Sequence, residues 1–214
     1  MEKKYEIIIF DLDGTLLDTS PGIFNSVRFA EAQMGFTPVS DQQLKAFVGP
    51  PPKEMYKKFH GVDDETAIKA TGFHRQYSRE KAIYEAAIYP GMKETLESLK
   101  QQGYKLAVAT LKGQKIAEKV LQIHGLDGYF DSIVGMDEAE SFTKCKTIQV
   151  AMEQIGTTGK VLMVGDSEYD YIGAVEAGVD FIGASYGFGI CPEDTRFSLI
   201  AQPKDLLDYI ESNK

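Results

Sequence analysis

A pair of acidic residues follows the most hydrophobic stretch near the start of the chain. Residues 7–15, IIIFDLDGT, read as a buried strand that ends at two carboxylates, Asp11 and Asp13. Ionised carboxylates at the end of a buried strand are costly unless a positive charge or hydrogen-bond donors surround them. The sequence therefore indicates a site in which a compensating charge sits beside this pair.

Further polar residues follow or precede other expected strands. Thr110 ends the second strand, with Lys112 two residues later, and Asp166 and Asp170 follow the fourth. Lys144 opens the helix that leads into that fourth strand. Because ligands of an open parallel sheet bind beyond the carboxyl ends of its strands, we expect these side chains to gather at one edge.

Such a cluster of carboxylates requires a cation. Two carboxylates roughly 5 Å apart repel by about 3 kcal/mol at an effective dielectric constant of about 20. Oxygen donors suit a hard ion, and Mg²⁺ commonly binds a few carboxylates together with substrate oxygens and waters. The sequence has no H-E-x-x-H motif and no cluster of cysteine and histidine that would indicate zinc. The acids therefore predict a magnesium site.

The elements that must position these residues alternate along the chain. Short β-branched runs that predict strands occupy residues 5–10, 106–110, 132–135, 160–165 and 180–185. Segments with the apolar spacing of helices occupy residues 91–103, 113–125, 144–156 and 168–178. Strands that alternate with helices predict an α/β fold with a parallel sheet covered by helices.

One long segment breaks this alternation. From residue 20 to about 87 the sequence has helical patterns and turns but no convincing strand. We expect a helical unit inserted after the first strand, with crossings near residues 17–19 and 86–89. The predicted domains are a catalytic core of residues 1–17 and 87–214 and a helical insertion of residues 18–86.

Composition limits the classes of partner. The chain has 214 residues and a formal net charge of −9, which disfavours nucleic acid and anionic membrane surfaces. No stretch has the roughly 20 apolar residues that span a bilayer. Two cysteines, Cys145 and Cys191, lie far apart and predict unpaired thiols in a cytoplasmic protein. Composition leaves the oligomeric state open.

Four short motifs resemble those of the haloacid dehalogenase-like hydrolase superfamily. They are DLDGT at 11–15, Thr110, Lys144 and GDSEYD at 165–170, in order along the whole chain. The helical insertion resembles the α-helical cap of the phosphoglycolate phosphatase-like branch. The resemblance implies a Rossmann-like core with the first strand at its centre, and Mg²⁺ as cofactor.

The resemblance also implies catalytic roles. Asp11 would attack phosphorus and form an aspartyl-phosphate. Asp13 would protonate the leaving alcohol and then deprotonate the hydrolytic water. Thr110 and Lys144 would hold phosphoryl oxygens. A structural interpretation exists for each phosphate-binding residue, since Thr110 could satisfy a turn and Lys144 could be an exposed helix lysine.

The resemblance implies a metal site made by the same acids. Asp166 would bind Mg²⁺ together with Asp11 and the backbone carbonyl of Asp13. Asp170 would orient the water ligands of the metal, or Lys144, from just outside the first set of ligands. Asp170 could also serve only as a partner of the helix dipole.

These features predict an Mg²⁺-dependent phosphatase for a small phosphomonoester, such as phosphoglycolate, a nucleotide or a sugar phosphate. A sugar phosphomutase of the same superfamily and a non-enzymatic phospho-acceptor protein are the alternatives. For three features the sequence does not distinguish a role at the site from an ordinary structural role. They are Lys112, the Gly49–Pro52 loop and the Tyr186–Gly189 loop.

Overall fold

The protein is built on a parallel sheet in the order β5-β4-β1-β6-β7-β8, seen in a computed structural model that describes residues 4–139, 141–156 and 158–213. The strands are β1 Ile7–Phe10, β4 Lys105–Gly113, β5 Ser132–Met136, β6 Val161–Gly165, β7 Asp180–Ala184 and β8 Ser198–Ile200. β1 lies between β4 and β6, so the expected α/β fold with a central first strand is confirmed.

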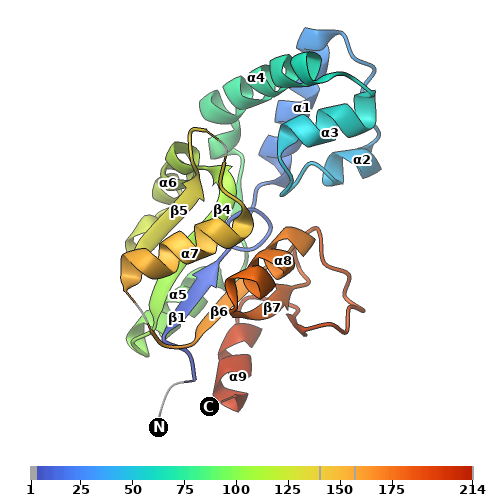
Figure 1. Cartoon of the computed structure of the whole chain (residues 1–214). Coiled ribbons are helices and arrows are strands. Elements are labelled where there is room, and N and C mark those ends of the chain that lie inside the picture. The colour runs from blue at the N-terminus through green and yellow to red at the C-terminus, as the bar shows by residue number, and fades with distance from the viewer. Residues whose placement is uncertain (1–3, 140, 157, 214) are drawn as a thin grey trace.

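Helices cover both faces of the sheet and form a separate group beyond it (Figure 1). They are α1 Ser20–Met34, α2 Asp41–Lys45, α3 Pro52–His60, α4 Asp64–Glu80, α5 Met92–Gln101, α6 Gln114–Ile123, α7 Lys144–Ile155, α8 Glu168–Ala177 and α9 Asp205–Ser212, with the short 3-10 helices η1 Ala82–Tyr84 and η2 Asp127–Tyr129. None of the described helices is both long and apolar enough to cross a membrane.

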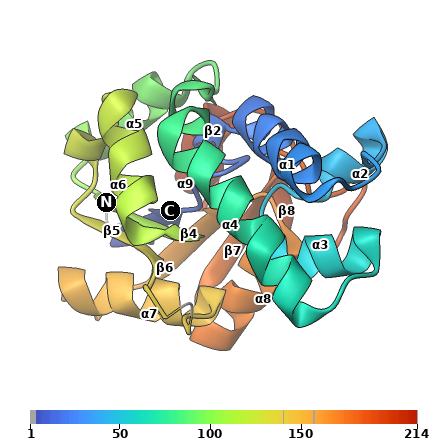
Figure 2. The ribbon, with the colours of Figure 1, turned by 90° about the horizontal axis from the view of Figure 1, so that it is seen from above.

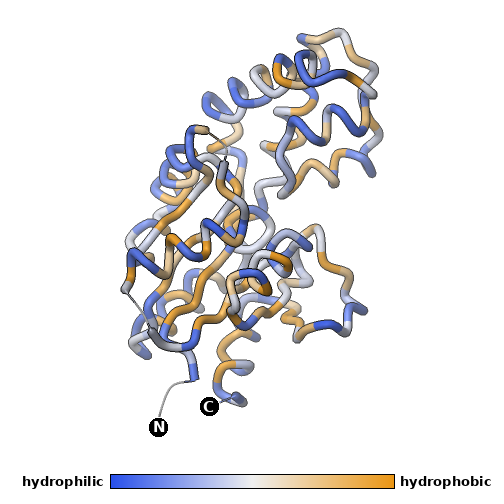
Figure 3. The backbone as a smooth tube through the Cα atoms, viewed as in Figure 1, coloured by the Kyte–Doolittle hydropathy of each residue, from blue (hydrophilic) through white to orange (hydrophobic). Residues whose placement is uncertain are grey.

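Successive side chains of β1 point to opposite faces of the sheet, so each face has its own hydrophobic cluster. Ile7 and Ile9 belong to the cluster that includes residues of α7 and α8, whereas Ile8 and Phe10 belong to the cluster with α5, α6 and α9. All four side chains are fully buried, because a central parallel strand has helices on both sides. Figure 3 shows the same pattern as hydrophobic strands surrounded by helices of mixed character. The sheet is thereby a rigid base for the residues that follow its strands.

Helices α1 to α4 form a group of their own, which we call the helical unit. Its buried cluster draws on residues between Ile23 and Ala70, and Figure 1 shows the unit beyond the sheet. Figure 2, turned to look from above, places it nearer to the viewer than the sheet. The chain enters the unit through β2, Leu17–Asp18, and leaves it through β3, Ala87–Ile88, and these two short strands pair antiparallel. The two crossings therefore lie side by side.

Candidate active site

The loop after β1 carries the first two acids. The backbone N–H of Asp11 donates to the Val164 carbonyl of β6 at 2.9 Å, which fixes this residue at the edge of the sheet. Gly14 follows with φ of +81°, and a Cβ there would lie 2.2 Å from Oδ2 of Asp166. Glycine is therefore needed both for the turn and for the close approach of the loop to Asp166.

Lys144 joins Asp11 to Asp170. Its ammonium donates to Oδ1 of Asp11 and lies 2.6 Å from Oδ1 of Asp170. The residue is the first of α7, and the Thr143 hydroxyl caps that helix by accepting the Lys146 N–H. Lys144 is only 5% exposed, so the interpretation of an exposed helix lysine is wrong.

A glycine in α8 makes room for Lys144. A Cβ built on Gly173 would lie 2.7 Å from both Cβ and Cγ of the lysine. These atoms are the buried base of the side chain rather than its flexible end, so they cannot move aside without displacing the ammonium. The packing of α8 against α7 thus helps to fix the position of the charge.

Gly173→Ala is expected to lower the free energy of unfolding by about 1–3 kcal/mol, because the added methyl group overpacks this contact. Gly72, in the exposed part of α4, has no atom within 4 Å of its hypothetical Cβ and provides a matched control. Gly72→Ala should raise stability by about 0.5–1 kcal/mol through helix propensity and unfolded-state entropy. Urea unfolding measures the free energy of unfolding of both variants. Equal changes in the two variants would contradict the proposed overpacking at Gly173.

Asp166 is held from two sides. The backbone N–H of Phe188 donates to its Oδ2 at 2.8 Å, and the Thr15 hydroxyl donates to its Oδ1 at 3.4 Å. Carboxylate oxygens of Asp11, Asp166 and Asp170 all lie within 4.8 Å of one another, and all three residues are buried. The structure therefore brings three of the four predicted acids into one cluster, while the carboxylate of Asp13 lies outside it.

Asp170 differs from the other two acids in its partners. Its Oδ2 accepts the Ser167 N–H at 2.9 Å and the Ser167 hydroxyl at 2.6 Å, and its Oδ1 faces Lys144. Both oxygens are therefore engaged by the protein, in a capping box at the start of α8. This arrangement is suited to positioning Lys144. Both oxygens of Asp166 are also engaged, but by the neutral donors of Phe188 and Thr15 rather than by a cation.

Burial governs the protonation of the cluster. It raises the pKa of Asp11 to about 7, although Lys144 opposes the shift. Burial, followed by the charges of Asp170 and Asp11, raises the pKa of Asp166 well above its ordinary value. Burial disfavours the charge of Lys144, yet Asp11 and Asp170 together raise its pKa, so the lysine is a cation. A crowded set of hard oxygen donors with raised pKa values fits a divalent ion such as Mg²⁺.

Thr110 and Lys112 lie two residues apart on the extended end of β4. The Thr110 hydroxyl is buried and accepts the backbone N–H of Lys112 at 3.2 Å. The Lys112 ammonium lies 2.9 and 3.1 Å from the two carboxylate oxygens of Asp13. Its side chain is 15% exposed, so an exposed surface position is excluded. The sequence carried one signal for this position of Lys112, its two-residue spacing from Thr110, because residues two apart point to the same side of a strand.

The helical unit contributes to the mouth of the site. A pocket lined by Asp11, Asp13, Asp170, Thr110 and both lysines is also bordered by Gly49 from the loop before α3 and by Tyr169 of α8. The Tyr169 hydroxyl donates to Oε2 of Glu54 in α3 at 3.4 Å. The Gly49–Pro52 loop, left open by the sequence, therefore reaches the site through its first residue.

The Tyr186–Gly189 loop links the helical unit to the acids. The backbone of Phe188 binds Asp166, while its side chain packs against the hydrophobic cluster of the helical unit. The Tyr186 hydroxyl donates to the Thr15 carbonyl at 3.0 Å. The sequence leaves this loop open between a role at the site and an ordinary structural role, because its contacts bring together segments that lie far apart in the chain.

Comparison with known proteins gives the same family from sequence and from structure. The family model described as haloacid dehalogenase-like hydrolase matches residues 8–184. A 5'-nucleotidase of Pseudomonas aeruginosa is 35% identical over 188 residues, which is 87% of this chain and 85% of that protein. A phosphoglycolate phosphatase of Vibrio vulnificus is 32% identical over 201 residues, with 87% and 86% covered.

A solved structure supports the assignment over nearly the whole chain. The crystal structure of a predicted phosphatase from Clostridium acetobutylicum superposes with a TM-score of 0.89 at 34% identity and covers 97% of this chain and 99% of that one. The matched residues include the loops after β1 and β6, the end of β4 with Thr110 and the start of α8 with Asp170. The chain therefore belongs to the haloacid dehalogenase-like hydrolase family.

Proposed function

We propose that this enzyme is an Mg²⁺-dependent phosphatase that hydrolyses a small phosphomonoester through an aspartyl-phosphate on Asp11. The observation that carries the proposal is the position of Asp11, buried at the end of β1 between Lys144 and Asp166. The reported relatives include a phosphatase and a nucleotidase, and both names describe hydrolysis of phosphate esters.

Asp11 is the nucleophile of the first step. Lys144 engages Oδ1 and leaves Oδ2 without a hydrogen-bond donor among the described residues. A bond forms between an Asp11 oxygen and phosphorus, and the bond from phosphorus to the leaving oxygen breaks. Thr110 and Lys144 bind phosphoryl oxygens, where stabilisation of charge contributes much of the rate.

Asp13 acts as the general acid of the first step and the general base of the second. In the first step its protonated carboxyl donates to the leaving oxygen, so that a neutral alcohol departs. In the second step the same carboxylate takes a proton from the water that attacks phosphorus, and Asp11 is released as a carboxylate. Acid–base assistance of this kind typically contributes roughly 10²–10⁴ in rate.

Asp11, Asp166 and the backbone carbonyl of Asp13 would hold Mg²⁺, with Asp170 acting through Lys144. When bound, the ion would supply positive charge that offsets the carboxylates and the phosphoryl oxygens. Residues 18–86 would act as a cap over the core of residues 1–17 and 87–214. Gly49 of the helical unit and Tyr169 of the core both line the pocket, which supports the role of the helical unit as a cap. Closure of the cap at this point would exclude water during phosphoryl transfer.

Mg²⁺ is expected to raise the thermal midpoint of the protein, and to raise it more at high pH. Without metal, the raised pKa values of Asp11 and Asp166 mean that the folded state binds more protons than the unfolded chain. Their contribution to stability therefore falls as pH rises from about 4 to about 7. Ion binding offsets this loss. At an Mg²⁺ concentration about 100 times the dissociation constant, binding adds about 2.7 kcal/mol to the free energy of unfolding, which raises the thermal midpoint by roughly 5 °C or more.

Thermal unfolding with Mg²⁺ or with chelator, at about pH 5 and about pH 8, measures this effect. A midpoint that did not respond to the ion at either pH would contradict the metal site. A response equal at both pH values would contradict the protonation of its ligands.

Phosphate release from a panel of small phosphomonoesters tests the proposed function. We expect release with Mg²⁺ and none with chelator. Transfer of phosphate between two hydroxyls of a sugar, without net release, would instead indicate a phosphomutase. An acyl phosphate that persisted for minutes, with no turnover of any ester, would indicate a phospho-acceptor protein.

A further inference from the structure

Three consecutive residues of the Tyr186–Gly189 loop lie against Asp166. The backbone N–H of Phe188 donates to its Oδ2 at 2.8 Å, and the backbone N–H of Gly189 donates to its backbone carbonyl at 3.1 Å. A Cβ built on Gly187 would lie 2.4 Å from Cβ of Asp166 and 2.5 Å from its Oδ2, so a residue without a side chain is needed for this close approach. The orientation of the Asp166 carboxylate therefore depends on where the loop lies.

Phe188 contacts both parts of the molecule. Its backbone binds Asp166 of the core, whereas its partly buried side chain packs against the buried cluster of the helical unit. Contact between apolar side chains stabilises the arrangement in which they are packed, in proportion to the apolar area that is removed from water. The position of the helical unit therefore influences the position of the N–H that Asp166 accepts.

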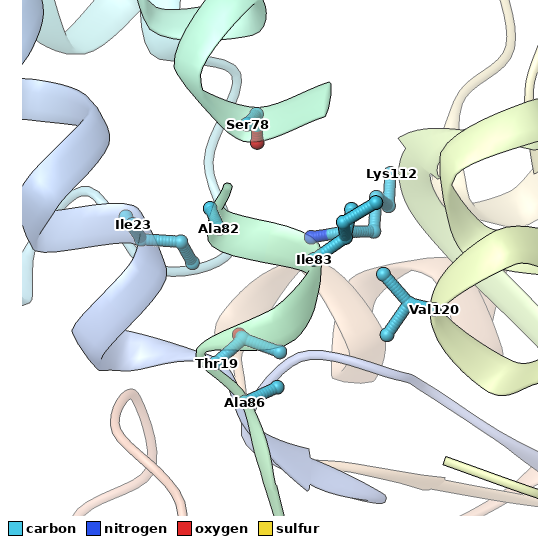
Figure 4. Close-up of a pocket in the computed structure, with 8 residues that line it drawn as sticks. All are labelled: Thr19, Ile23, Ser78, Ala82, Ile83, Ala86, Lys112 and Val120. Carbon is cyan, nitrogen blue, oxygen red and sulfur yellow. The ribbon is translucent and has the colours of Figure 1, made fainter. Parts of the chain in front are cut away.

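The helical unit is joined to the sheet at one narrow place. Thr19 directly follows β2 and Ala86 directly precedes β3, and Figure 4 shows these two residues close together at one small pocket. A unit that two adjacent crossings connect can tilt against the sheet, because a hinge needs only a few residues to absorb the change. Its tilt is then fixed by contacts outside the crossings. These include the packing of Phe188 and the hydrogen bond from Tyr169 to Glu54.

Residues on either side of Phe188 are fixed to the core. The ring of Tyr186 packs edge-on against Tyr89, directly after β3, with ring centroids 4.8 Å apart. Farther along the chain, the Arg196 guanidinium donates to both carboxylate oxygens of Glu168 at 2.8 and 2.6 Å. Between these two points a glycine precedes Phe188 and another follows it, which gives the backbone wide freedom. The contacts of Phe188 itself therefore determine its position.

We propose that Phe188 is a positioning residue through which the packing of the helical unit affects how tightly the site binds Mg²⁺. The inference rests on the proposed Mg²⁺-dependent phosphatase and adds a determinant of metal affinity outside the acids. With its side chain packed on the helical unit, Phe188 holds Oδ2 of Asp166, and this oxygen can still accept a further bond. Without that packing, the carboxylate must be ordered when the ion binds, at a cost in affinity. By linkage, a bound ion favours the packed position of Phe188.

Titration calorimetry with Mg²⁺ alone, without substrate, tests the proposal. Phe188→Ala is expected to raise the dissociation constant roughly fivefold or more, which approaches the roughly 10–100-fold cost of losing a hydrogen-bond partner of a metal ligand. Phe188→Leu keeps an apolar side chain and should bind Mg²⁺ as the wild type does. Gly187→Ala should also weaken binding, because its methyl group displaces the loop from Asp166.

Phe59→Ala is the matched control. Phe59 lies in α3, is partly buried against the same cluster of the helical unit, and stacks on Phe47 with ring centroids 5.6 Å apart. The variant removes an aromatic ring from that cluster and leaves the bridge to Asp166 in place. It should lower the thermal midpoint without changing the dissociation constant of Mg²⁺, which separates the proposed role of Phe188 from general loosening of the helical unit.

Hydrogen exchange of the backbone N–H groups in residues 186–189 provides a second measurement. Mg²⁺ should slow this exchange in the wild type and in Phe188→Leu more strongly than in Phe188→Ala, because the ion and the side chain act on the same loop.

Equal dissociation constants for the wild type and Phe188→Ala, or an equal loss of affinity in Phe59→Ala, would overturn the coupling and leave the phosphatase function standing. Mg²⁺ binding that depends on Phe188, without hydrolysis of any phosphomonoester, would overturn the function and leave the coupling. Absence of Mg²⁺ binding to the wild type would overturn both.

Discussion

Asp11→Asn is expected to lower kcat by roughly 10⁴-fold or more while the protein stays folded, because loss of a nucleophile removes the covalent route altogether. Asparagine has nearly the shape of aspartate, and its amide oxygen can still accept a hydrogen bond from Lys144. The change also removes one negative charge from a cluster whose carboxylates repel each other. We therefore expect the thermal midpoint without metal to be unchanged or higher.

Trapping of the intermediate gives the direct measurement. Acid quenching during turnover of a labelled substrate should leave a base-labile phosphate on the wild-type protein and none on Asp11→Asn. Asp131→Asn is a suitable control, since Asp131 pairs with Lys100 and Lys105 away from the site and its loss should spare turnover. Retention of more than a few per cent of activity by pure Asp11→Asn would contradict the nucleophile assignment.

The placement of the acids illustrates what the sequence can predict. Alternating strands and helices imply a parallel sheet, and a parallel sheet brings the carboxyl ends of its strands to one edge. That rule alone places Asp11, Asp166 and Lys144 together, and the structure does so. The strand runs were strong signals because β1 and β6 are buried on both faces and therefore uniformly apolar.

The missed features depend on contacts between distant segments. β8 has three residues and was not identified, and neither was α9, because short or terminal segments carry little periodicity. The double contact of Phe188 with Asp166 and with the helical unit follows only from the path of its loop in space. The approach of Gly173 to Lys144 is likewise a property of how two helices pack, which residue spacing within one helix does not reveal.

The position of Lys112 shows how little separates a surface residue from a functional one in sequence. A lysine two residues beyond the end of a strand is commonly solvated. Here β4 extends to Gly113, with an irregular register against β5 between Ala109 and Gly113. That extension carries the ammonium inward to Asp13 rather than outward to water. The structure thus places at the site a second cation, Lys112, whose role the sequence leaves open.

Asp13→Asn is expected to slow both half-reactions by roughly 10²–10⁴-fold, since an amide can neither donate the acid proton nor accept one from water. The effect should depend on the leaving group. An alkyl phosphate needs protonation of its leaving oxygen, whereas p-nitrophenyl phosphate releases a stable anion without it. Formation of the aspartyl-phosphate should therefore be slowed much more for the alkyl ester, and hydrolysis of the intermediate should be slowed equally for both.

Rapid-quench kinetics with the two esters separates these steps. With p-nitrophenyl phosphate the variant should show a burst of nitrophenol followed by slow turnover, because the first step survives and the second does not. Asp13→Asn also leaves Lys112 without its carboxylate partner, so Lys112→Met provides the control for loss of the ion pair alone. If Asp13→Asn recovered the full rate at saturating Mg²⁺, the residue would act only through the metal. An equal loss of the first step for both esters would exclude proton donation to the leaving oxygen.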